Sequence, residues 1–367
     1  MSPRPTDSFP SSAPPDGGAA TLAQTLDARV REAELVERLD AGAVRCVACG
    51  HRCLVRPGRR GICKVRFNRE GTLYAPSGYV AALQCDPTEK KPFFHVLPGS
   101  AALTFGMLGC DFHCGYCQNW LTSQALRDPE AGVQPQDVTP ETLVGLARQS
   151  GARLVASSYN EPLITTEWAV HVFRAAREAG LKTAFVSNGN ATAAALDFLR
   201  PWTDCYKIDF KAIDDRRYRE LGGVLDHVLA AIRMVWERGL WLEIVTLVVP
   251  GFNDDPSGLR RMADEIAVVS PEIPWHVTAF HADYRMQDTA NTGAETLVRA
   301  CEIGTAAGLR YVYAGNLPGR VGRWEHTYCP DCGDLLIERH GYLIRRQRIG
   351  PNGRCPSCSR RIPGVWC

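Results

Sequence analysis

Residues 101–117 read AALTFGMLGCDFHCGYC, so an apolar run leads directly into three closely spaced cysteines. The stretch from 102 to 107 predicts a β-strand, and Cys110, Cys114 and Cys117 follow it in a C-x3-C-x2-C spacing. Three thiolates can hold three irons of a 4Fe–4S cluster, and residues 118–123 offer no fourth cysteine, so one iron would stay open to a ligand. We therefore predict a reactive cluster at the end of a strand. A zinc knuckle is the other interpretation of this spacing.

Cysteine is the informative residue in the composition of the chain. Of the 15 cysteines, eleven fall into three groups, which is typical of metal or cluster sites in a reducing compartment rather than of disulfides. We therefore expect a cytoplasmic protein. The groups are Cys46, Cys49, Cys53 and Cys63; Cys110, Cys114 and Cys117; and Cys329, Cys332, Cys355 and Cys358.

Length, charge and hydropathy limit the classes of protein to which the chain could belong. A chain of 367 residues with 45% hydrophobic content can bury a large core and hold more than one domain. The net charge of +2 indicates no polyanionic partner for the chain as a whole. No run approaches the ~20 apolar residues that cross a bilayer, and no signal-peptide pattern opens the sequence, so we expect neither membrane insertion nor export.

The chain divides into four parts by composition. Residues 1–21 are rich in Pro, Ser, Ala and Gly and should form a disordered tail. Residues 22–100 contain a predicted amphipathic helix over 22–39, followed by a cysteine-rich metal or cluster segment. Residues 101–322 form an α/β domain, and residues 323–367 form a zinc ribbon.

The cysteine-rich segment contains a predicted metal site. Cys46, Cys49, Cys53 and Cys63 could meet at a tetrahedral zinc or at a second iron–sulfur cluster, and the spacing does not choose between them. Four unligated structural cysteines are the remaining interpretation. Residues 65–74 predict a hairpin that turns at Glu70-Gly71, and the polar loop 86–92 could reach over the mouth of the following domain.

Residues 101–322 alternate apolar strands with helical segments, which predicts a parallel α/β domain. Predicted helices such as 165–179 and 225–238 end at Gly180 and Gly239. No G-x-G-x-x-G opens a helix after a strand, which argues against a nicotinamide or flavin site. The predicted strands are 102–107, 153–158, 182–187, 205–210, 242–249, 275–280 and 310–314.

Polar residues recur just after these strands. In a barrel such positions share one rim, where side chains converge on a ligand. Any one of them alone would be an ordinary turn or helix cap, so their recurrence at one end is what indicates a site. The stretches are 159–161, 187–190, 209–211, 250–254, 281–284 and 315–316.

The last 45 residues predict a zinc ribbon. Cys329-x2-Cys332 and Cys355-x2-Cys358 form two knuckles joined by a hairpin-like stretch over 335–349. Several arginines make this part basic, so it could contact RNA or an acidic protein, although a solvated arginine face is the simpler explanation. They are Arg339, Arg345, Arg346, Arg348, Arg354, Arg360 and Arg361.

In combination, these motifs resemble the radical S-adenosylmethionine (SAM) superfamily. Within it the chain is similar to the radical SAM enzyme of the AmmeMemoRadiSam group, whose members resemble the pyruvate formate-lyase activating enzymes. The resemblance spans about residue 46 to the C-terminus. Its carriers are the Cys46–Cys63 set, the loop 86–92, the Cys110 motif continuing into Gln118-Asn119-Trp120, Tyr159-Asn160-Glu161-Pro162, residues 207–211 and the ribbon.

The resemblance implies a partial (β/α)6 barrel, a 4Fe–4S cluster on Cys110, Cys114 and Cys117, and SAM as cofactor. In the superfamily the amino and carboxylate groups of SAM chelate the unique iron, and one electron cleaves SAM to a 5'-deoxyadenosyl radical.

The resemblance also implies which residues contact SAM. Asn160 and Glu161 would stand where the superfamily's Gly-Gly-Glu motif meets the SAM amino group, and Ser187 and Asn188 would lie near the ribose and carboxylate. This sequence has Tyr-Asn-Glu instead, so only the role of Glu161 carries over directly. Asp209 and Lys211 could orient the methionyl carboxylate or the substrate.

Two radical functions and one alternative follow. The radical would abstract hydrogen from a glycyl residue of a partner protein, as an activase does, or from a small molecule or bound peptide. The alternative is an RNA-modifying radical SAM enzyme or nucleic-acid-binding protein that uses the arginine-rich ribbon, and the modest charge argues against it. Expected partners are an AMMECR-type or Memo-type protein of the same system, or a glycyl radical enzyme, together with an external one-electron reductant.

Overall fold

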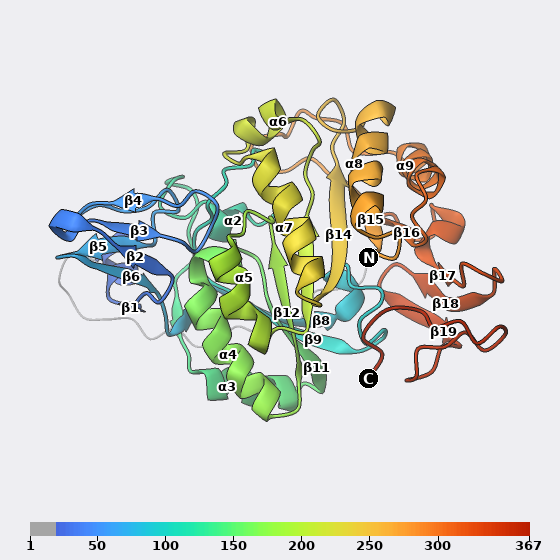
Figure 1. Ribbon diagram of the computed structural model, residues 1–367, viewed down its shortest axis with the longest axis horizontal. Helices are drawn as coiled ribbons and strands as arrows, with labels where there is room; N and C mark the ends of the chain where they lie inside the picture. Colours follow the sequence, from blue (N-terminus) through green and yellow to red (C-terminus); the bar gives the residue numbers. More distant parts are fainter. Residues whose placement is uncertain (1–19) are drawn as a thin grey trace.

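The fold is built around one eight-stranded sheet in a computed structural model that describes residues 20–367 (Figure 1). The strand order is β16-β15-β14-β13-β12-β11-β9-β8; β9 to β16 run parallel, and β8 pairs antiparallel with β9 at the edge. All seven predicted strands are present, with ends shifted by at most two residues. The strands are β8 (Ala82–Pro87), β9 (Ala101–Gly106), β11 (Ala152–Ser157), β12 (Lys182–Ser187), β13 (Cys205–Asp209), β14 (Trp241–Val248), β15 (Trp275–Ala279) and β16 (Val312–Gly315).

A long helix follows each of the first six parallel strands, which confirms a partial (β/α)6 barrel with a seventh strand. The predicted helices 165–179 and 225–238 are α4 and α7, and each stops where Gly180 or Gly239 takes a positive φ of 78° or 69°. The helices are α3 (Pro140–Gln149), α4 (Thr166–Glu178), α5 (Ala193–Leu199), α7 (Leu225–Glu237), α8 (Pro256–Val269) and α9 (Ala294–Ala306), with the short α2 (Trp120–Ser123) and α6 (Asp215–Glu220) beside them.

The N-terminal segment is mostly β-structure, so the predicted helix over 22–39 is wrong beyond Asp27. Only α1 (Leu22–Asp27) is helical, and Thr21, expected at the end of a disordered tail, caps it through the Gln24 amide. The periodicity misled because its later apolar residues pair with strands of the cysteine-rich segment, partners that a local pattern does not show. Residues 1–19 of the expected tail lie outside the described residues.

Two small sheets make up this segment, in the orders β1-β6-β5 and β2-β3-β4. The predicted hairpin is confirmed, because β5 and β6 pair across Glu70 and Gly71, which have φ of 52° and 90°. The strands are β1 (Val30–Glu32), β2 (Val36–Arg38), β3 (Val44–Cys46), β4 (Leu54–Val55), β5 (Phe67–Arg69) and β6 (Thr72–Pro76). A further short pair, β7 (Tyr79–Val80) and β10 (Gln136–Asp137), follows.

A buried ion pair joins this segment to the barrel. The Arg66 guanidinium bonds to the Glu167 carboxylate on α4, and both side chains are almost fully buried. Arg66 Nε also donates to the Ile164 carbonyl at 2.8 Å, while Glu167 accepts the backbone amides of Glu34 and Leu35 at 3.2 Å each. Hydrogen bonds on both partners offset the desolvation of the two charges.

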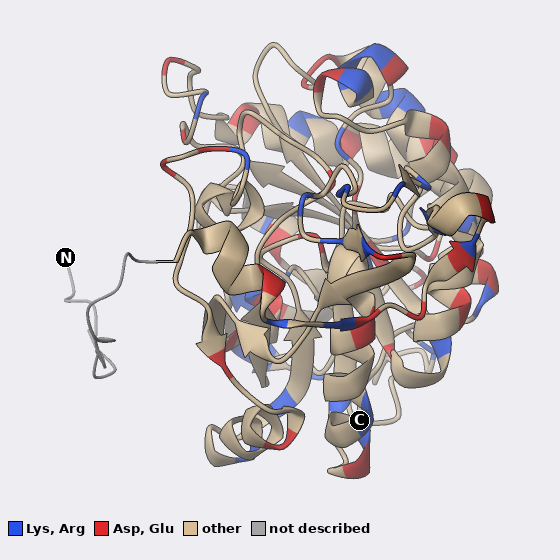
Figure 2. Cartoon of the chain, turned by 90° about the vertical axis from the view of Figure 1, so that its left-hand side faces the viewer, with Lys and Arg blue, Asp and Glu red and all other residues tan. Residues whose placement is uncertain are grey.

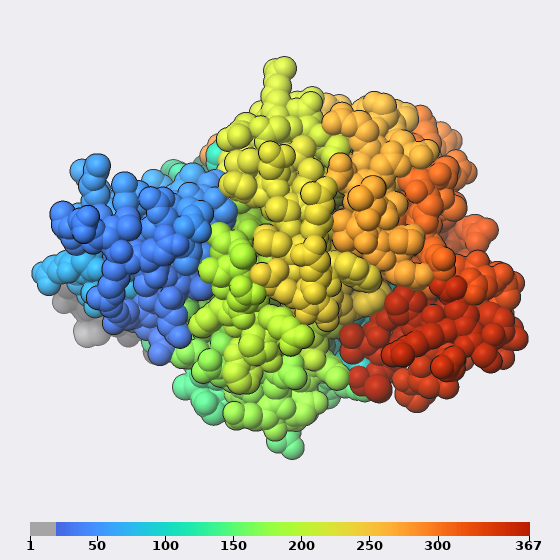
Figure 3. All heavy atoms as spheres, in the orientation of Figure 1, coloured from blue at the N-terminus to red at the C-terminus, as the bar shows by residue number. Residues whose placement is uncertain are grey.

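The ribbon packs at the opposite end of the barrel from the cysteine-rich segment (Figure 3). It consists of β17 (Thr327–Tyr328), β18 (Leu335–His340) and β19 (Leu343–Gln347), which form the expected hairpin. The thiol sulfurs of Cys329, Cys332, Cys355 and Cys358 all lie within 4.8 Å of one another. This separation suits four thiolates around one zinc ion.

The distribution of charged residues and the hydropathy of the helices agree with what the sequence predicts. Acidic and basic residues intermix over the face seen in Figure 2, as a net charge of +2 suggests. Within residues 20–367 we find no helix of the length and apolarity needed to cross a membrane. All fifteen cysteines are free thiols.

Replacing Cys355 by Ser should release about one zinc per chain and make residues 323–367 sensitive to protease, because so short a ribbon has little apolar area with which to fold without a metal. Elemental analysis and limited proteolysis measure both effects. Cys367→Ser is the matched control, since Cys367 is exposed and lies outside the four ligands. A full-length protein without zinc whose tail stays protease-resistant would contradict this assignment.

His95 should make the ribbon junction acid-sensitive. Its Nδ1 donates to the Pro363 carbonyl at 2.7 Å, its Nε2 accepts from the Tyr313 hydroxyl at 2.6 Å, and burial lowers its pKa to about 4. The unfolded chain, with a His pKa near 6.5, therefore binds more protons between these values, so stability falls as pH drops from about 6.5 to 4, by up to about 3 kcal/mol. Urea unfolding should show a shallower acid slope for His95→Gln, and equal slopes would contradict this.

Candidate functional site

A cavity of about 370 Å³ opens at the carboxyl ends of the parallel strands. It is lined by Cys110, Cys114 and Cys117 and by every side chain expected to contact SAM. The parallel direction of β9 to β16 explains this convergence, because the residues that follow these strands share one edge of the sheet. The expected SAM contacts that line it are Asn160, Glu161, Ser187, Asn188, Asp209 and Lys211.

The cysteine loop presents three thiols to this cavity, and no other cysteine lines it. The Phe112 amide donates to Cys110 Sγ at 3.3 Å, and the Ser123 hydroxyl lies 3.1 Å from Cys117 Sγ. Burial raises the pKa of Cys114 to about 12 and that of Cys110 well above its usual range, so the thiols ionise only when a cation binds them. Three thiols around one cavity fit a 4Fe–4S cluster with three protein ligands.

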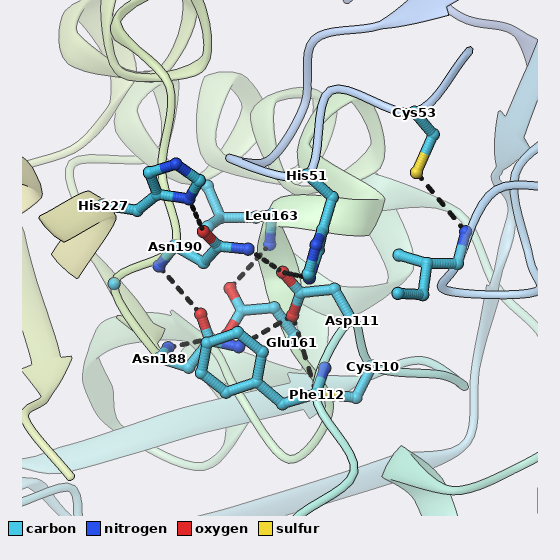
Figure 4. A network of polar contacts seen from close by, with 12 residues as sticks. His51, Cys53, Cys110, Asp111, Phe112, Glu161, Leu163, Asn188, Asn190 and His227 are labelled. Atoms are coloured by element: carbon cyan, nitrogen blue, oxygen red, sulfur yellow. Dashed lines mark hydrogen bonds and ion pairs between the residues drawn. The ribbon is translucent and has the colours of Figure 1, made fainter. Parts of the chain in front are cut away.

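Asp111, inside the cysteine loop, anchors that loop to the end of β12 (Figure 4). Its carboxylate is fully buried and accepts from the side-chain amides of Asn188 at 2.7 Å and Asn190 at 2.8 Å. His51 Nε2, from the cysteine-rich segment, lies 3.9 Å from the same carboxylate, and His227 Nδ1 lies 3.1 Å from the Asn190 amide oxygen. Sequence reasoning missed this role, for which the only signal was an aspartate between Cys110 and Phe112.

Glu161 lies beside Asp111 and holds the neighbouring loop ends together. One carboxylate oxygen accepts the Leu163 amide at 3.0 Å and the Ser187 hydroxyl at 2.8 Å, and the other accepts the Asn188 amide at 2.7 Å. Burial, reinforced by the charge of Asp111, raises the pKa of Glu161 to about 8. A carboxylate offers about four acceptor positions, so these three bonds leave one for a ligand in the cavity.

Glu161 is also the N-cap of η3 (Pro162–Thr165), the short helix that precedes α4. A helix-capping role, which was the alternative to SAM binding for this residue, is therefore present in the structure. Asn160 is engaged as well, because its amide oxygen accepts from Met107 at 3.0 Å and its amide donates to the Glu161 carbonyl at 3.2 Å. Both residues position the strand ends at the cavity.

Lys211 and Asp209 face each other at the far side of the cavity, 3.1 Å apart. Burial lowers the pKa of Lys211, but the Asp209 carboxylate and nearby groups outweigh burial, so the pKa lies well above its ordinary value. Asn253, one of the residues expected at the rim, does not line the cavity; it donates to the Lys211 carbonyl at 2.7 Å and so positions that backbone. Lys211 therefore stays cationic.

Three cavity residues were missed by the sequence analysis. Lys207 is 5% exposed, and burial lowers its pKa to about 8. Lys91, carried by the loop 86–92, donates to the Tyr159 hydroxyl at 2.8 Å, so this loop does reach the cavity. Tyr342 comes from the ribbon hairpin and donates to the Asn316 amide oxygen at 3.2 Å. Only the packing of distant segments brings Lys91 and Tyr342 to the cavity.

The stretch 281–284, expected at the rim, lies outside the cavity lining. Tyr284 instead stacks on Trp120 with ring centroids 5.1 Å apart, and its hydroxyl donates to Asp128 at 2.6 Å. These contacts hold α2, directly after the cysteine loop, against the end of β15. The stretch supports the site without lining it.

The N-terminal cysteines form a separate group. The Cys46 amide donates to the Cys53 carbonyl at 3.0 Å, and the Ile62 amide donates to Cys53 Sγ at 3.5 Å. Among the described residues, only the ribbon cysteines bring three or more metal-binding atoms within 4.8 Å of one another. Cys46, Cys49, Cys53 and Cys63 thus do not come as close together as the four ribbon cysteines do.

Comparison with known proteins identifies relatives. The Radical SAM superfamily matches residues 105–262. An uncharacterized protein of Methanocaldococcus jannaschii is 36% identical over 341 residues, covering 91% of this chain and 99% of its own. The pyruvate formate-lyase 1-activating enzyme of Escherichia coli (strain K12) is 28% identical over 170 residues, covering 46% of this chain and 68% of its own.

Among solved structures, a radical SAM methyltransferase from Sphaerobacter thermophilus is similar, with a TM-score of 0.46 and 17% identity, covering 72% of this chain and 76% of that one. The superfamily match covers the cysteine loop and the strands from β11 to β14, which form much of the cavity. The chain therefore belongs to the radical SAM superfamily and is homologous to the pyruvate formate-lyase activating enzymes.

Proposed function

We propose that this radical SAM enzyme removes a hydrogen atom from a glycyl residue of a partner protein. The observation that carries the proposal is the cavity that Cys110, Cys114 and Cys117 share with the side chains suited to SAM. When bound there, the cluster and SAM supply a 5'-deoxyadenosyl radical. The homology to activating enzymes for pyruvate formate-lyase and for isethionate sulfite-lyase supports a glycyl radical enzyme as the partner.

In this proposal the residues of the chain bind the cluster and orient SAM. Cys110, Cys114 and Cys117 would hold the cluster, and the free acceptor position of Glu161 would receive an N–H of the SAM amino group. Lys211, kept cationic by Asp209, would bind the SAM carboxylate or a substrate anion. Cys114 and Glu161 are buried, which excludes water from their contacts and strengthens them.

The resemblance and the cysteine content also suggest partner proteins and a cellular compartment. The companion proteins of the AmmeMemoRadiSam group, of AMMECR or Memo type, are the other proposed partners, and an external one-electron reductant is required in either case. Eleven thiols committed to metal or cluster binding need a reducing compartment, so we propose the cytoplasm.

A small anionic molecule is the second candidate substrate. Lys90, Lys91 and Lys207 line the cavity, and Tyr342 of the ribbon covers part of it. Lys207 has no carboxylate within ion-pair distance among the described residues, so it is available to an anion. A carboxylate or phosphate compound would match these charges.

The ribbon gives less support to an RNA substrate. Arg339 is buried and donates to the Phe94 carbonyl at 2.9 Å, so it holds the ribbon to the barrel. Arg348 bonds to Asp334, and Arg360 bonds to Asp331 and Glu272. These arginines are committed to contacts within the chain, which leaves fewer for a nucleic acid.

Deuterium transfer distinguishes the two substrates. The reconstituted enzyme is incubated with SAM, dithionite and either a glycine-deuterated partner protein or deuterated carboxylate and phosphate compounds. Deuterium in 5'-deoxyadenosine together with a glycyl radical signal supports the activase, and deuterium from a small anion supports the second candidate. Transfer from neither substrate class would contradict both.

Changing Cys110, Cys114 and Cys117 to Ala should abolish formation of 5'-deoxyadenosine from SAM under dithionite, because no cluster can then be held at the cavity. Cys85→Ala is the control, since Cys85 is exposed and does not line the cavity. Product analysis by chromatography measures both. Residual cleavage by the triple variant above the rate without enzyme would overturn the assignment of the cluster.

Glu161→Gln should weaken SAM binding about tenfold to a hundredfold, the loss of one charge-assisted hydrogen bond of about 1.5 to 3 kcal/mol, while the cluster stays intact. Because the pKa of Glu161 is about 8 and the N–H of the SAM amino group donates to the ionised carboxylate, wild-type affinity should rise as pH increases through about 8. The variant should lack this rise.

Titration of SAM at several pH values, with cluster absorbance as an integrity check, measures both effects. Glu178→Gln is the matched control, because Glu178 is exposed at the end of α4 and does not line the cavity. Unchanged affinity and an unchanged pH profile in Glu161→Gln would leave this residue a helix cap only.

A further inference from the structure

The cysteine-rich segment and the Cys110 loop are in direct contact. Arg127 bridges them, donating to the Phe112 carbonyl at 2.7 Å and to the Ile62 carbonyl, next to Cys63, at 2.6 Å. A Cβ added to Gly109 would lie 3.3 Å from the Cys63 carbonyl oxygen, so the backbones of the two loops pack closely. Whatever Cys63 and its neighbours bind therefore adjoins the proposed SAM cluster.

The four N-terminal cysteines gather in one buried place. Cys46, Cys49 and Cys63 are 5 to 6% exposed, and none of the four forms a disulfide. Cys46 is joined to Cys53 by a backbone hydrogen bond of 3.0 Å, and Cys53 Sγ accepts the amide that precedes Cys63 at 3.5 Å. Four reduced thiols buried together indicate a bound metal group.

The separation of the thiols argues against a single zinc ion. Two sulfurs bound to one zinc at about 2.3 Å cannot be more than about 4.6 Å apart. The four ribbon thiols all lie within 4.8 Å of one another, close to this limit, whereas no three of the four N-terminal thiols in the described structure lie that close together. A 4Fe–4S cluster binds each cysteine through a different iron and so holds its ligands further apart. The Cys110, Cys114 and Cys117 thiols likewise do not all lie within 4.8 Å of one another.

The surroundings supply N–H donors to these sulfurs. Arg66 is 1% exposed, and its guanidinium lies with Nη1 3.7 Å from Cys46 Sγ while it also bonds to Glu167. The Ile62 amide donates to Cys53 Sγ. Hydrogen bonds to the sulfurs and a nearby fixed cation stabilise an anionic cluster and set its reduction potential.

We propose that Cys46, Cys49, Cys53 and Cys63 ligate a second 4Fe–4S cluster. With four cysteine ligands it has no open iron, so it exchanges electrons and binds no SAM. It is reduced by one electron from a low-potential one-electron donor outside the chain, and the donor is oxidised by one electron. Its position beside the Cys110 loop would let it serve as the electron store for that site.

The full-length variant with Cys110, Cys114 and Cys117 changed to Ala tests this proposal without SAM cleavage. After anaerobic reconstitution with iron and sulfide, it should retain about four irons and four sulfides per chain, beside about one ribbon zinc. Dithionite titration should deliver about one electron per chain to the variant and about two to the wild type. The reduced variant should give an iron–sulfur EPR signal.

Cys53→Ser provides the second measurement, because Cys53 is the most exposed of the four and its replacement disturbs the core least. Combined with the triple variant, it should lose the remaining iron or change its EPR signal, with circular dichroism as a check on folding. A triple variant that carries about two zincs and no iron overturns the proposal, and so does one whose iron takes up no electron. These outcomes do not depend on whether the wild type cleaves SAM.

Discussion

The Asp111 carboxylate is fully buried directly after Cys110, and a buried charge is stable only when hydrogen-bond donors surround it. Asn188 and Asn190 supply those donors from the loop after β12. The carboxylate therefore fixes the cysteine loop against the sheet edge at which the cavity opens. Glu161 completes the arrangement, because it binds Ser187 and the Asn188 backbone from the neighbouring strand. Two buried carboxylates thus hold the start of the cysteine loop, at Cys110, against the sheet edge.

The two terminal parts enclose this centre in different ways. The cysteine-rich segment is held to α4 by the buried pair of Arg66 and Glu167 and reaches the cysteine loop through Arg127. The ribbon packs on the other side and contributes Tyr342 to the cavity. The barrel supplies the cysteine loop that lines the cavity. The cysteine-rich segment places four more cysteines next to this loop, and the ribbon adds one side chain to the cavity wall.

Much of the fold and part of the candidate site could be predicted from the sequence. The seven parallel strands were found because buried strands are continuous apolar runs, and α4 and α7 because glycines end them. Four of the six polar stretches expected at the rim contribute to the cavity lining, because residues after parallel strands share one edge of the sheet. The predicted N-terminal helix was wrong because β1 pairs with the distant strand β6 and β2 turns back onto β3. The roles of Asp111 and Tyr342 could not be assigned, since their contacts depend on packing between distant segments.

The central claim is that a cluster on Cys110, Cys114 and Cys117 keeps one iron for SAM. Electron–nuclear double resonance on the reduced, reconstituted enzyme tests it most directly, using SAM labelled with 15N in its amino group and 17O in its carboxylate. The account predicts hyperfine coupling of both labels to the cluster in the wild type, and none in the triple cysteine variant. A cluster signal in the wild type that SAM leaves unchanged, with no coupling to either label, would contradict it.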